Sequence, residues 1–397
     1  MLLFKCYFKR KSTLCIILLI FIANYMTFIG IRSLLSTYQG YCEMSSLVHE
    51  GTYIANLNPK NDYSFANITE SDVQQIFNYL DRNFDFALYI DGNLITLPDC
   101  DIEVSVNYLN EEYYKLFPLE LEQGIKLSFD YKLNDDEIPV LIGTGLSKTY
   151  PLGSTISISD PAMGRNITLK VVGILKKNAF HSNYYMPNWK NYYNFSIFVP
   201  VNQIFIENAN VDFHINSIMN LIVLHTTVEK TETLSDILLE NLGLQFKFYS
   251  QQENYEHFEN DYLKSIIIQF ISALVLYAIT IWIANRNILK GNRLLLNNLS
   301  SSISENVNSV KIRKSGYIYL KLIFLLGLLG VFIFTAYERF SYWVKKDTLV
   351  AAYGFLGLTD IDWGSWLTVL FIDMLIGVLI VETASKHFLN LFSKQEY

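Results

Sequence analysis

Four long apolar stretches stand out in the hydrophobic pattern of this chain of 397 residues. Each contains about 20 residues, the length at which a helix crosses the hydrocarbon core of a bilayer. The pattern therefore predicts membrane-spanning helices at residues 14–35, 263–285, 317–337 and 366–385. One helix thus precedes the long segment 36–262, and three helices follow it.

Within 36–262 the hydrophobic periods are shorter, as is typical of a water-exposed α+β domain. Thr69 and Asp72 form a capping-box pattern at the start of a helix that continues to residue 83. Further helices are predicted at 110–117, 231–243 and 251–264. The last of these runs directly into the second span.

Strand patterns alternate irregularly with these helices. Six of them lie at 138–143, 154–159, 167–175, 196–201, 220–226 and 245–250. Two more, at 86–90 and 94–97, flank Asp91-Gly92-Asn93 and predict a β-hairpin. The run 102–109 alternates, with Ile102, Val104 and Val106 on one face. The irregular order favours two small α+β lobes over one doubly wound sheet.

Lysine and arginine residues near the spans determine the expected orientation, because cytoplasmic flanks carry an excess of them. Basic residues gather at 5–11, 286–314 and 386–394, and Lys345 and Lys346 oppose this pattern weakly. We expect a multi-pass protein of the cell membrane with both termini cytoplasmic. The remaining segments are a cytoplasmic tail, a cytoplasmic connection, an outer loop and a second cytoplasmic tail, at 1–13, 286–316, 338–365 and 386–397. A cleaved signal peptide is the alternative for the first span, although its apolar core is long for one.

Composition and charge add to this picture. Only 17% of the residues are charged and 51% are hydrophobic, which favours a membrane protein. Segment 36–262 holds 13 Lys and Arg against 30 Asp and Glu, a net charge of −17, while the rest of the chain carries +10. Such an acidic domain is first of all a solvated surface; attraction of cationic substrates is a second interpretation.

Two cysteines lie in the predicted outer domain, Cys42 and Cys100. A disulfide between them is possible in an oxidising compartment, and two free thiols are equally compatible with the sequence. The other two, Cys6 and Cys15, lie in the tail and the first span, where no disulfide is expected.

Nucleotide-binding and catalytic patterns are absent from the sequence. The stretch GTGLSKT at 143–149 has Ser147 where a phosphate-binding loop needs its second glycine, and it lies outside the membrane, away from ATP. The six histidines lack zinc-site spacing, and the acidic run at 135–137 lacks the ligand pattern of a calcium loop. We therefore expect no cofactor, no metal and no enzyme activity in this chain.

Among the polar residues inside the predicted spans, three are candidates for a role: Asn24, Gln269 and Asp373. A charged side chain at the centre of a bilayer costs roughly 2.5–3.5 kcal/mol, so such residues usually face other helices. Asp373 either helps to transmit movement or pairs with a partner, or it makes a helix–helix hydrogen bond without a role in transport. Gly327, Gly330 and Gly377 fit close helix packing.

An aromatic, Asn-rich segment, HSNYYMPNWKNYYNF, covers residues 181–195. Tyr and Trp are common in binding surfaces. A contact with a peptide or an outer partner and an ordinary inserted loop are both compatible with this composition.

The order of elements and three pieces of sequence resemble the MacB-type, FtsX-like permeases of ATP-binding-cassette (ABC) transport systems. The pieces are VNYLNEEYYKLFPLELEQG at 106–124, IPVLIGTGLSKTYPLGSTISI at 138–158 and ITLKVVGILKKN at 167–178. The resemblance implies one helix, a large extracytoplasmic α+β domain of two lobes, and three further helices. It also implies a permease subunit that exports or releases a peptide, a lipid-linked molecule or a toxin by transmitting force. The composition, rich in Ile, Asn, Lys and Tyr, is typical of a low-GC bacterium.

Partners follow from the same resemblance. A cytoplasmic ABC ATPase would supply the energy, and a second permease copy, identical or not, would complete the assembly in the lipid membrane; we expect no nucleic acid partner. The contact with the ATPase would involve a basic and apolar group after the second span: Arg286, Lys290, Arg293, Leu294, Leu295 and Leu296. This stretch lacks the Glu and the small-residue–Gly pair of the family. A membrane-anchored binding or immunity protein that works without ATP therefore stays the alternative.

Overall fold

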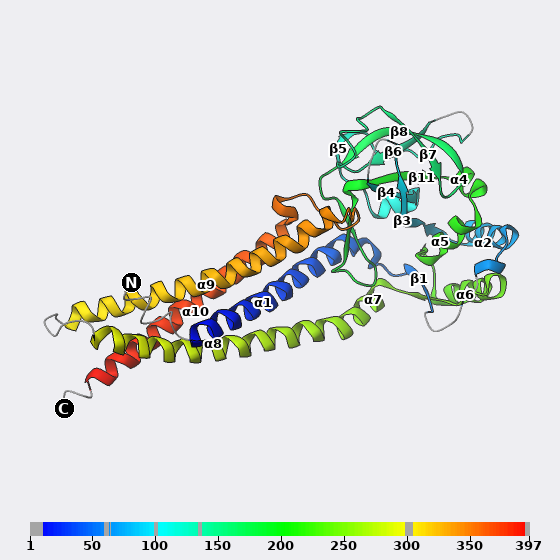
Figure 1. The fold of residues 1–397 in the computed structure, drawn as a ribbon. Helices are drawn as coiled ribbons and strands as arrows, with labels where there is room; N and C mark the ends of the chain where they lie inside the picture. The colour runs from blue at the N-terminus through cyan, green and yellow to red at the C-terminus, as the bar shows by residue number, and fades with distance from the viewer. Residues whose placement is uncertain are drawn as a thin grey trace. The chain divides into compact units, whose positions relative to one another are not determined.

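A computed structural model describes residues 11–58, 63, 65–98, 102–133, 137–297 and 305–393 of the chain (Figure 1). The chain divides into two compact units, each discontinuous in sequence. The membrane unit comprises the described residues of Met1–Leu35, Asp261–Arg339 and Leu358–Tyr397. The α/β unit comprises those of Ser36–Asn260 and Phe340–Gly357.

Four helices among the described residues are long and apolar enough to cross a membrane, which confirms the predicted order of one helix and then three. They are α1 (Lys11–Glu43), α8 (Lys264–Asn297), α9 (Glu305–Val344) and α10 (Asp360–Ser393). Each is longer than its apolar stretch, because helical hydrogen bonding continues after the hydrophobic pattern has ended. The expected connection at 286–316 is therefore largely helical, and its residues 298–304 lie outside the described part.

Helix α1 contacts the other three helices of the membrane unit. A Cβ atom at Gly327 of α9 would lie 2.6 Å from Ile20 Cγ2, and one at Gly330 would lie 2.9 Å from Phe21 Cδ2. These glycines thus allow α9 to pack closely on α1 within one chain. Gly377 of α10 lies against Phe324 of α9 with more room, since its added Cβ would be 3.5 Å away.

The first lobe of the α/β unit is an antiparallel sheet in the order β13-β1-β12-β2. Its strands are β1 (Tyr53–Leu57), β2 (Asp85–Ala87), β12 (Ile222–Leu224) and β13 (Phe246–Tyr249). Its helices are α2 (Glu70–Asn83), α5 (Val211–Met219) and α6 (Val228–Leu242). The predicted capping box of Thr69 and Asp72 starts α2, and α6 ends at Gly243 as expected.

The second lobe is a seven-stranded mixed sheet in the order β3-β4-β11-β6-β8-β5, with β7 paired to β8. Its strands are β3 (Tyr89–Thr96), β4 (Glu103–Asn110), β5 (Leu121–Gly124), β6 (Ile138–Ile142), β7 (Thr155–Asp160), β8 (Arg165–Leu175) and β11 (Ser196–Val201). The pairs β4–β11 and β6–β8 are parallel. Two short helices belong to this lobe, α3 (Glu111–Leu116) and α4 (Gln203–Asn208). Two sheets with separate helices confirm the expected two-lobed α+β fold.

The hairpin predicted at 86–97 is wrong. Strand β2 joins the first lobe and β3 joins the second, so the chain passes between the lobes at Leu88. Asp91 and Gly92 form a bulge inside β3, where the register on β4 shifts between Ile90 and Asn93. Gly92 has a φ of 79°. A bulge and a tight turn both use such a glycine, so the local sequence does not distinguish them.

Strand β4 also differs from its prediction, which gave it one apolar face. All residues from Val104 to Leu109 are buried. The reason is its central place between β3 and β11, with side chains in hydrophobic clusters on both faces of the sheet.

The segments between the lobes and the membrane helices are short. Strands β9 (Phe180–Ser182) and β10 (Lys190–Tyr192) form a two-stranded antiparallel sheet. Helix α7 (Gln251–Phe258) starts at a capping box of Ser250 and Glu253 and continues through a π-helical turn, Glu259–Leu263, into α8. Single 3-10 turns occur at Met44–Leu47, Phe65–Asn67, Tyr193–Phe195 and Phe355–Gly357.

Two glycines with positive φ allow a matched test of packing in the second lobe. Gly124 has a φ of 93°, and an added Cβ would lie 2.2 Å from the carbonyl oxygen of Val172. Gly153 has a φ of 85°, and its Cβ would meet nothing within 4 Å. We expect Gly153→Ala to lose about 1–2 kcal/mol of stability from the left-handed backbone alone. Gly124→Ala should lose clearly more, because the backbone of β8 must also move.

The measurement is the thermal midpoint of the purified full-length variants, followed by near-ultraviolet circular dichroism. Equal midpoints for the two variants would contradict the close approach of β5 and β8 at Gly124.

Candidate functional sites

The three polar residues predicted inside the spans are all bonded to other helices in the membrane unit. Asn24 Nδ2 donates to Asp373 Oδ2 at 2.7 Å, and the Tyr277 hydroxyl donates to Asn24 Oδ1 at 2.7 Å. Asn24 and Asp373 are 0% and 2% exposed. Gln269 Nε2 donates to the carbonyl oxygen of Met26 at 2.9 Å. Each polar group thus links α1 to α8 or α10.

A buried ion pair in the same unit was missed by the sequence analysis. Asp362 Oδ1 lies 2.6 Å from Arg32 Nε and 3.3 Å from an Nη atom of Arg339. Its other oxygen accepts the backbone N–H and the hydroxyl of Thr359 at the start of α10. The three charged residues lie in α1, α9 and α10, far apart in sequence. Arg32 inside a predicted span is the available signal, because a charged side chain in a span usually pairs with another polar group.

The predicted ATPase contact lies on the last turns of α8. Arg286 stacks over the ring of Trp282, with 4.3 Å from its guanidinium carbon to the ring centre. Lys290 lies one turn further along the same helix. Residues 293–296 are helical, but their side chains lie outside the described part, so this site stays a prediction.

The possible disulfide also stays a prediction. Cys42 is exposed near the end of α1. Its expected partner, Cys100, lies outside the described residues.

The aromatic segment 181–195 folds onto its own chain within the α/β unit. His181 Nδ1 lies 2.8 Å from Glu43 Oε1, and the backbone N–H of Ser182 donates to Glu43 Oε2 at 3.0 Å. Lys190 Nζ donates to Gln39 Oε1, and Ser36 Oγ donates to the carbonyl oxygen of Asn188. The last turns of α1, 36–43, are therefore bound to the β9–β10 hairpin.

Close packing accompanies these polar contacts. A Cβ atom at Gly40 would lie 2.1 Å from the carbonyl oxygen of Pro187. The His181 and Glu43 side chains are only 8% and 18% exposed, so their pairing is shielded from water. By contrast, Trp189 is 54% exposed and remains accessible.

Four buried tyrosines continue from His181 into the α/β unit. The Tyr113 hydroxyl lies 3.3 Å from His181 Nε2 and accepts a hydrogen bond from the Tyr184 hydroxyl. The hydroxyl groups of Tyr89 and Tyr193 share a hydrogen bond of 3.0 Å. Burial raises the pKa of all four phenols well above the ordinary value. They therefore stay protonated and serve as a neutral hydrogen-bonding core.

The same region binds the segment between α9 and α10. Asn178 Nδ2 donates to the carbonyl oxygen of Tyr353, and Asn178 Oδ1 accepts the N–H of Tyr353, both at 2.7 Å. Asn194 Nδ2 donates to the carbonyl oxygen of Ala351, and the N–H of Tyr192 donates to that of Leu349. Two chain segments that are continuous with membrane helices, 36–43 and 349–353, thus meet residues 178–195. We call residues 36–43, 178–195 and 349–353 together the junction.

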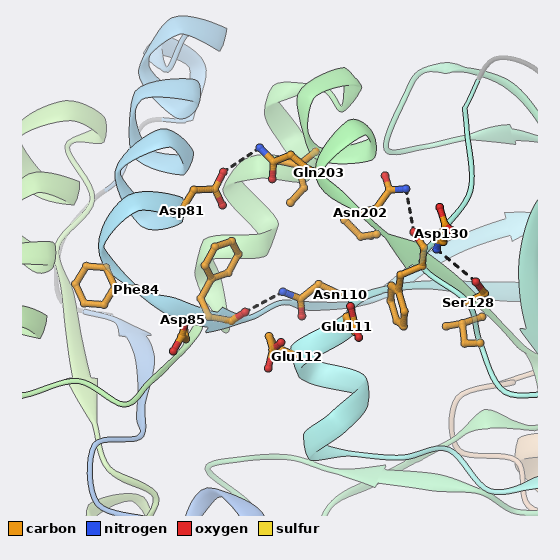
Figure 2. A pocket seen from close by; sticks show the side chains of 15 residues that line it. Asp81, Phe84, Asp85, Asn110, Glu111, Glu112, Ser128, Asp130, Asn202 and Gln203 are labelled. Carbon is orange, nitrogen blue, oxygen red and sulfur yellow. Dashed lines mark hydrogen bonds between the residues drawn. The ribbon is translucent and has the colours of Figure 1, made fainter.

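A cleft of about 770 Å³ lies between the two lobes of the α/β unit. The first lobe contributes Asp81, Phe84 and Asp85 from the end of α2 and from β2, as Figure 2 shows. The second lobe contributes the start of α3, the segment 127–130 and the start of α4. Asn110 connects the two sides, because its amide donates to the carbonyl oxygen of Phe86 and accepts from the N–H of Leu88.

Carboxylates dominate the polar lining of this cleft: Asp81, Asp85, Glu111, Glu112 and Asp130. Among the described residues, no lysine or arginine lines it. Lys115, outside the lining, neutralises part of this charge because it pairs with Glu111 and Glu112. His225 Nδ1 lies 3.2 Å from Asp85 Oδ2. Gln203 donates to Asp81. The arrangement can attract a cationic ligand through solvent.

The stretch GTGLSKT lies in tight turns against the junction. A Cβ atom at Gly143 would lie 1.9 Å from the carbonyl oxygen of Tyr193, and one at Gly145 would lie 2.5 Å from the ring of Phe195. The glycines are thus explained by packing.

Comparison with known proteins gives the family. The family model described as the MacB-like periplasmic core domain matches residues 18–236, more than half of the chain. This chain belongs to the MacB-like periplasmic core domain family.

The match confirms the resemblance drawn from the sequence and supports a permease-like subunit of an ABC-type transporter. Two solved structures are similar at low identity. The periplasmic region of MacB from Actinobacillus actinomycetemcomitans has 14% identity, covers 56% of this chain and 98% of its own, and gives a TM-score of 0.35. The extracellular domain of the noncanonic ABC-type transporter YknZ from Gram-positive bacteria has 17% identity, coverages of 50% and 99%, and a TM-score of 0.31. Comparison with curated proteins gave no match.

The junction of this MacB-like chain can be tested at Asn178. Its φ is 58°, so Asn178→Gly keeps the backbone angle. The change removes the two side-chain hydrogen bonds to Tyr353 and the one that Asn178 Oδ1 accepts from Asn194. We expect the segment 345–357 to detach more often and trypsin to cut after Lys345 or Lys346 roughly tenfold faster, since each lost hydrogen bond is worth about 1 kcal/mol.

Asn166→Gly, on the exposed end of the β7–β8 hairpin, is the matched control and should leave the cleavage rate unchanged. The junction would be refuted if the two variants were cut at the same rate as the parent chain.

Proposed function

We propose that this chain is the force-transmitting permease subunit of an ABC-type export or release system, powered by a separate cytoplasmic ATPase. The observation that carries this proposal is the continuity of α1. The helix begins in the membrane unit, and its last turns, 36–43, belong to the α/β unit, where Glu43 pairs with the buried His181. Displacement of α1 along its axis would therefore act directly on the junction.

Two further chain paths support force transmission. The segment 349–353, which follows α9, is bound to Asn178 and Asn194. Helix α7 continues into α8 through a π-helical turn, and such turns are frequent at functional sites. Tyr41 of α1 donates to Glu259 at 3.0 Å, so the ends of these two helical paths are also coupled to each other.

In this proposal the termini and the α8–α9 connection face the cytoplasm, where the ATPase would meet Arg286, Lys290, Arg293 and Leu294–Leu296. A second permease copy would complete the assembly in the cell membrane. The large apolar side chains that α8, α9 and α10 leave exposed, such as Leu274, Leu325 and Leu375, suit contact with lipid and with such a copy. The substrate would be a peptide, a lipid-linked molecule or a toxin, handled by the α/β unit.

The decisive experiment is a mild-detergent pull-down of the tagged chain from its native cells, with mass spectrometry and an ATPase assay. We expect a stoichiometric ABC ATPase with the parent chain. Arg286→Gln, Lys290→Gln and Arg293→Gln together should reduce its recovery roughly tenfold or more, because a few charged anchors dominate such interfaces. Gln keeps good helix propensity, so α8 should persist.

Lys345→Gln with Lys346→Gln is the control for lost positive charge, and it should retain the ATPase. If the parent chain elutes without any ATPase, the proposal fails. If all variants retain the ATPase equally, the contact site is wrong although the permease assignment stands.

The cleft favours a second candidate, a membrane-anchored binding or immunity protein that works without ATP. Its volume and its carboxylate lining suit an extended cationic ligand such as a basic peptide. Because most of these carboxylates are solvent-exposed, each would contribute only about 0.2–1 kcal/mol to binding, and salt would weaken the attraction.

This candidate predicts that a basic peptide binds the full-length protein in nanodiscs. Asp81→Asn, Glu112→Gln and Asp130→Asn together should weaken binding roughly tenfold at low salt. The control neutralises three exposed carboxylates elsewhere in the first lobe, Asp212, Glu232 and Glu240, and should change affinity little. Equal loss in both triple variants would show non-specific attraction to the acidic surface.

A further inference from the structure

The hydrogen bonds of the Asp373 carboxyl group are incomplete. Asn24 donates to Oδ2, but Oδ1 is buried and has no hydrogen-bond partner. The side chain lies in the middle of α10, a helix apolar enough to span the membrane, and the residue is 2% exposed. An isolated carboxylate in such surroundings loses its hydration and is strongly destabilised in the ionised form.

In the described part of the chain, the groups around Asp373 supply no compensating positive charge. From α1 come Asn24 and Thr27, which are polar and neutral, and from α8 comes Tyr277, whose hydroxyl is already donated to Asn24. From α9, Gly327 lies beside Asn24, 3.6 Å from its Nδ2 when a Cβ is added.

On α10 itself the nearest charged residues are distant. Asp362 and Glu382 lie 11 and 9 residues away, which corresponds to about 16 Å and about 14 Å along a helix. Arg32 and Arg339 are both bound to Asp362, and Arg286 stacks on Trp282 of α8. No ion pair of the described residues includes Asp373.

We propose that Asp373 is a proton-binding site of the membrane unit, occupied at neutral pH while α1 and α10 are packed as observed. A proton on Oδ1 removes the charge and leaves Oδ2 to accept from Asn24. One hydroxyl group then stays unpaired, and the free-energy cost of burying it is smaller than that of burying an unpaired charge. Loss of the proton would require water to enter between α1 and α10, so the proton would hold these two helices together.

A small metal cation is a poorer ligand for this site. Hard cations bind several oxygen ligands, and here Asn24 Oδ1 is already occupied by Tyr277. No group of three or more His, Cys, Asp or Glu residues that could hold a metal was found in the described parts of the chain. The proton needs only the single orphaned oxygen.

The same helix provides an internal control. Asp362 and Asp373 are both 2% exposed, but Asp362 is paired with Arg32 and Arg339 and accepts two hydrogen bonds from Thr359. It should therefore remain ionised. Dicyclohexylcarbodiimide is an apolar reagent that adds to protonated carboxyl groups in membranes and forms a stable N-acylurea that retains all atoms of the reagent.

We expect this reagent, applied to the full-length protein in membranes at neutral pH, to label Asp373 and not Asp362. The adduct is located by mass spectrometry, it should diminish at alkaline pH, and it should be lost in Asp373→Asn. Preferential labelling of Asp362 would overturn the proposal.

Failure of the reagent to reach the site is covered by a second measurement. Infrared spectra of the parent chain at neutral pH should contain a protonated carboxylic acid band that Asp373→Asn lacks. If the variant instead removes carboxylate bands, Asp373 is ionised and the proposal is wrong. Neither readout depends on an ATPase partner, so this result and that of the pull-down are independent.

Discussion

Polar side chains in the membrane unit must find partners inside the protein, because lipid provides none, and α1 is the helix on which this constraint acts most. Thr13 hydrogen-bonds Tyr319 of α9, Asn24 bonds both Tyr277 of α8 and Asp373 of α10, and Arg32 pairs with Asp362 of α10. These contacts lie at three levels along α1. They fix its depth and rotation against three other helices in a way that apolar packing alone does not.

The consequences of this constraint extend beyond the membrane unit, because the same helix ends in the α/β unit. Its last turns are held by Glu43 with His181, by Gln39 with Lys190 and by the close approach of Gly40 to Pro187. The residues of α1 that belong to the α/β unit are therefore fixed within that unit by polar contacts and close packing. Residues 349–353, which follow α9 in the chain, are bound to Asn178 and Asn194 in the same junction.

The sequence predicts those parts of this structure that depend on neighbouring residues. The capping box at Thr69, the end of α6 at Gly243 and the strands β6, β7, β8 and β11 all follow from short patterns and were found as expected. The prediction of a hairpin at Asp91-Gly92-Asn93 is wrong because the same residues can form a bulge. Only the pairing of β3 with β4 decides between a bulge and a turn. The segment 181–195 is compatible in sequence with a loop or a binding surface, because its partners, such as Glu43 and Ala351, are more than 100 residues away.

The candidate site residues show the same limit. Asn24 and Asp373 could each be recognised as polar residues in apolar stretches, but their pairing joins positions 349 residues apart, and no local pattern encodes it. The ion pair of Arg32, Asp362 and Arg339 was missed for the same reason. The coupling residues after α8 are recognised only through the family resemblance, and their side chains are described only at Arg286 and Lys290.

The contrast between Asp362 and Asp373 is the most informative feature of α10. Both carboxyl groups are equally buried on one helix, yet one is surrounded by two arginines and a capping threonine, whereas the other receives a single amide hydrogen bond. Structural stability requires that a buried carboxylate has partners for its oxygens, as Asp362 has. An apolar residue at 373 would pack without the cost of an unsatisfied oxygen, so stability alone does not explain the aspartate. Residues that break a packing rule without local compensation are where function is expected, and Asp373 is such a residue in the membrane unit.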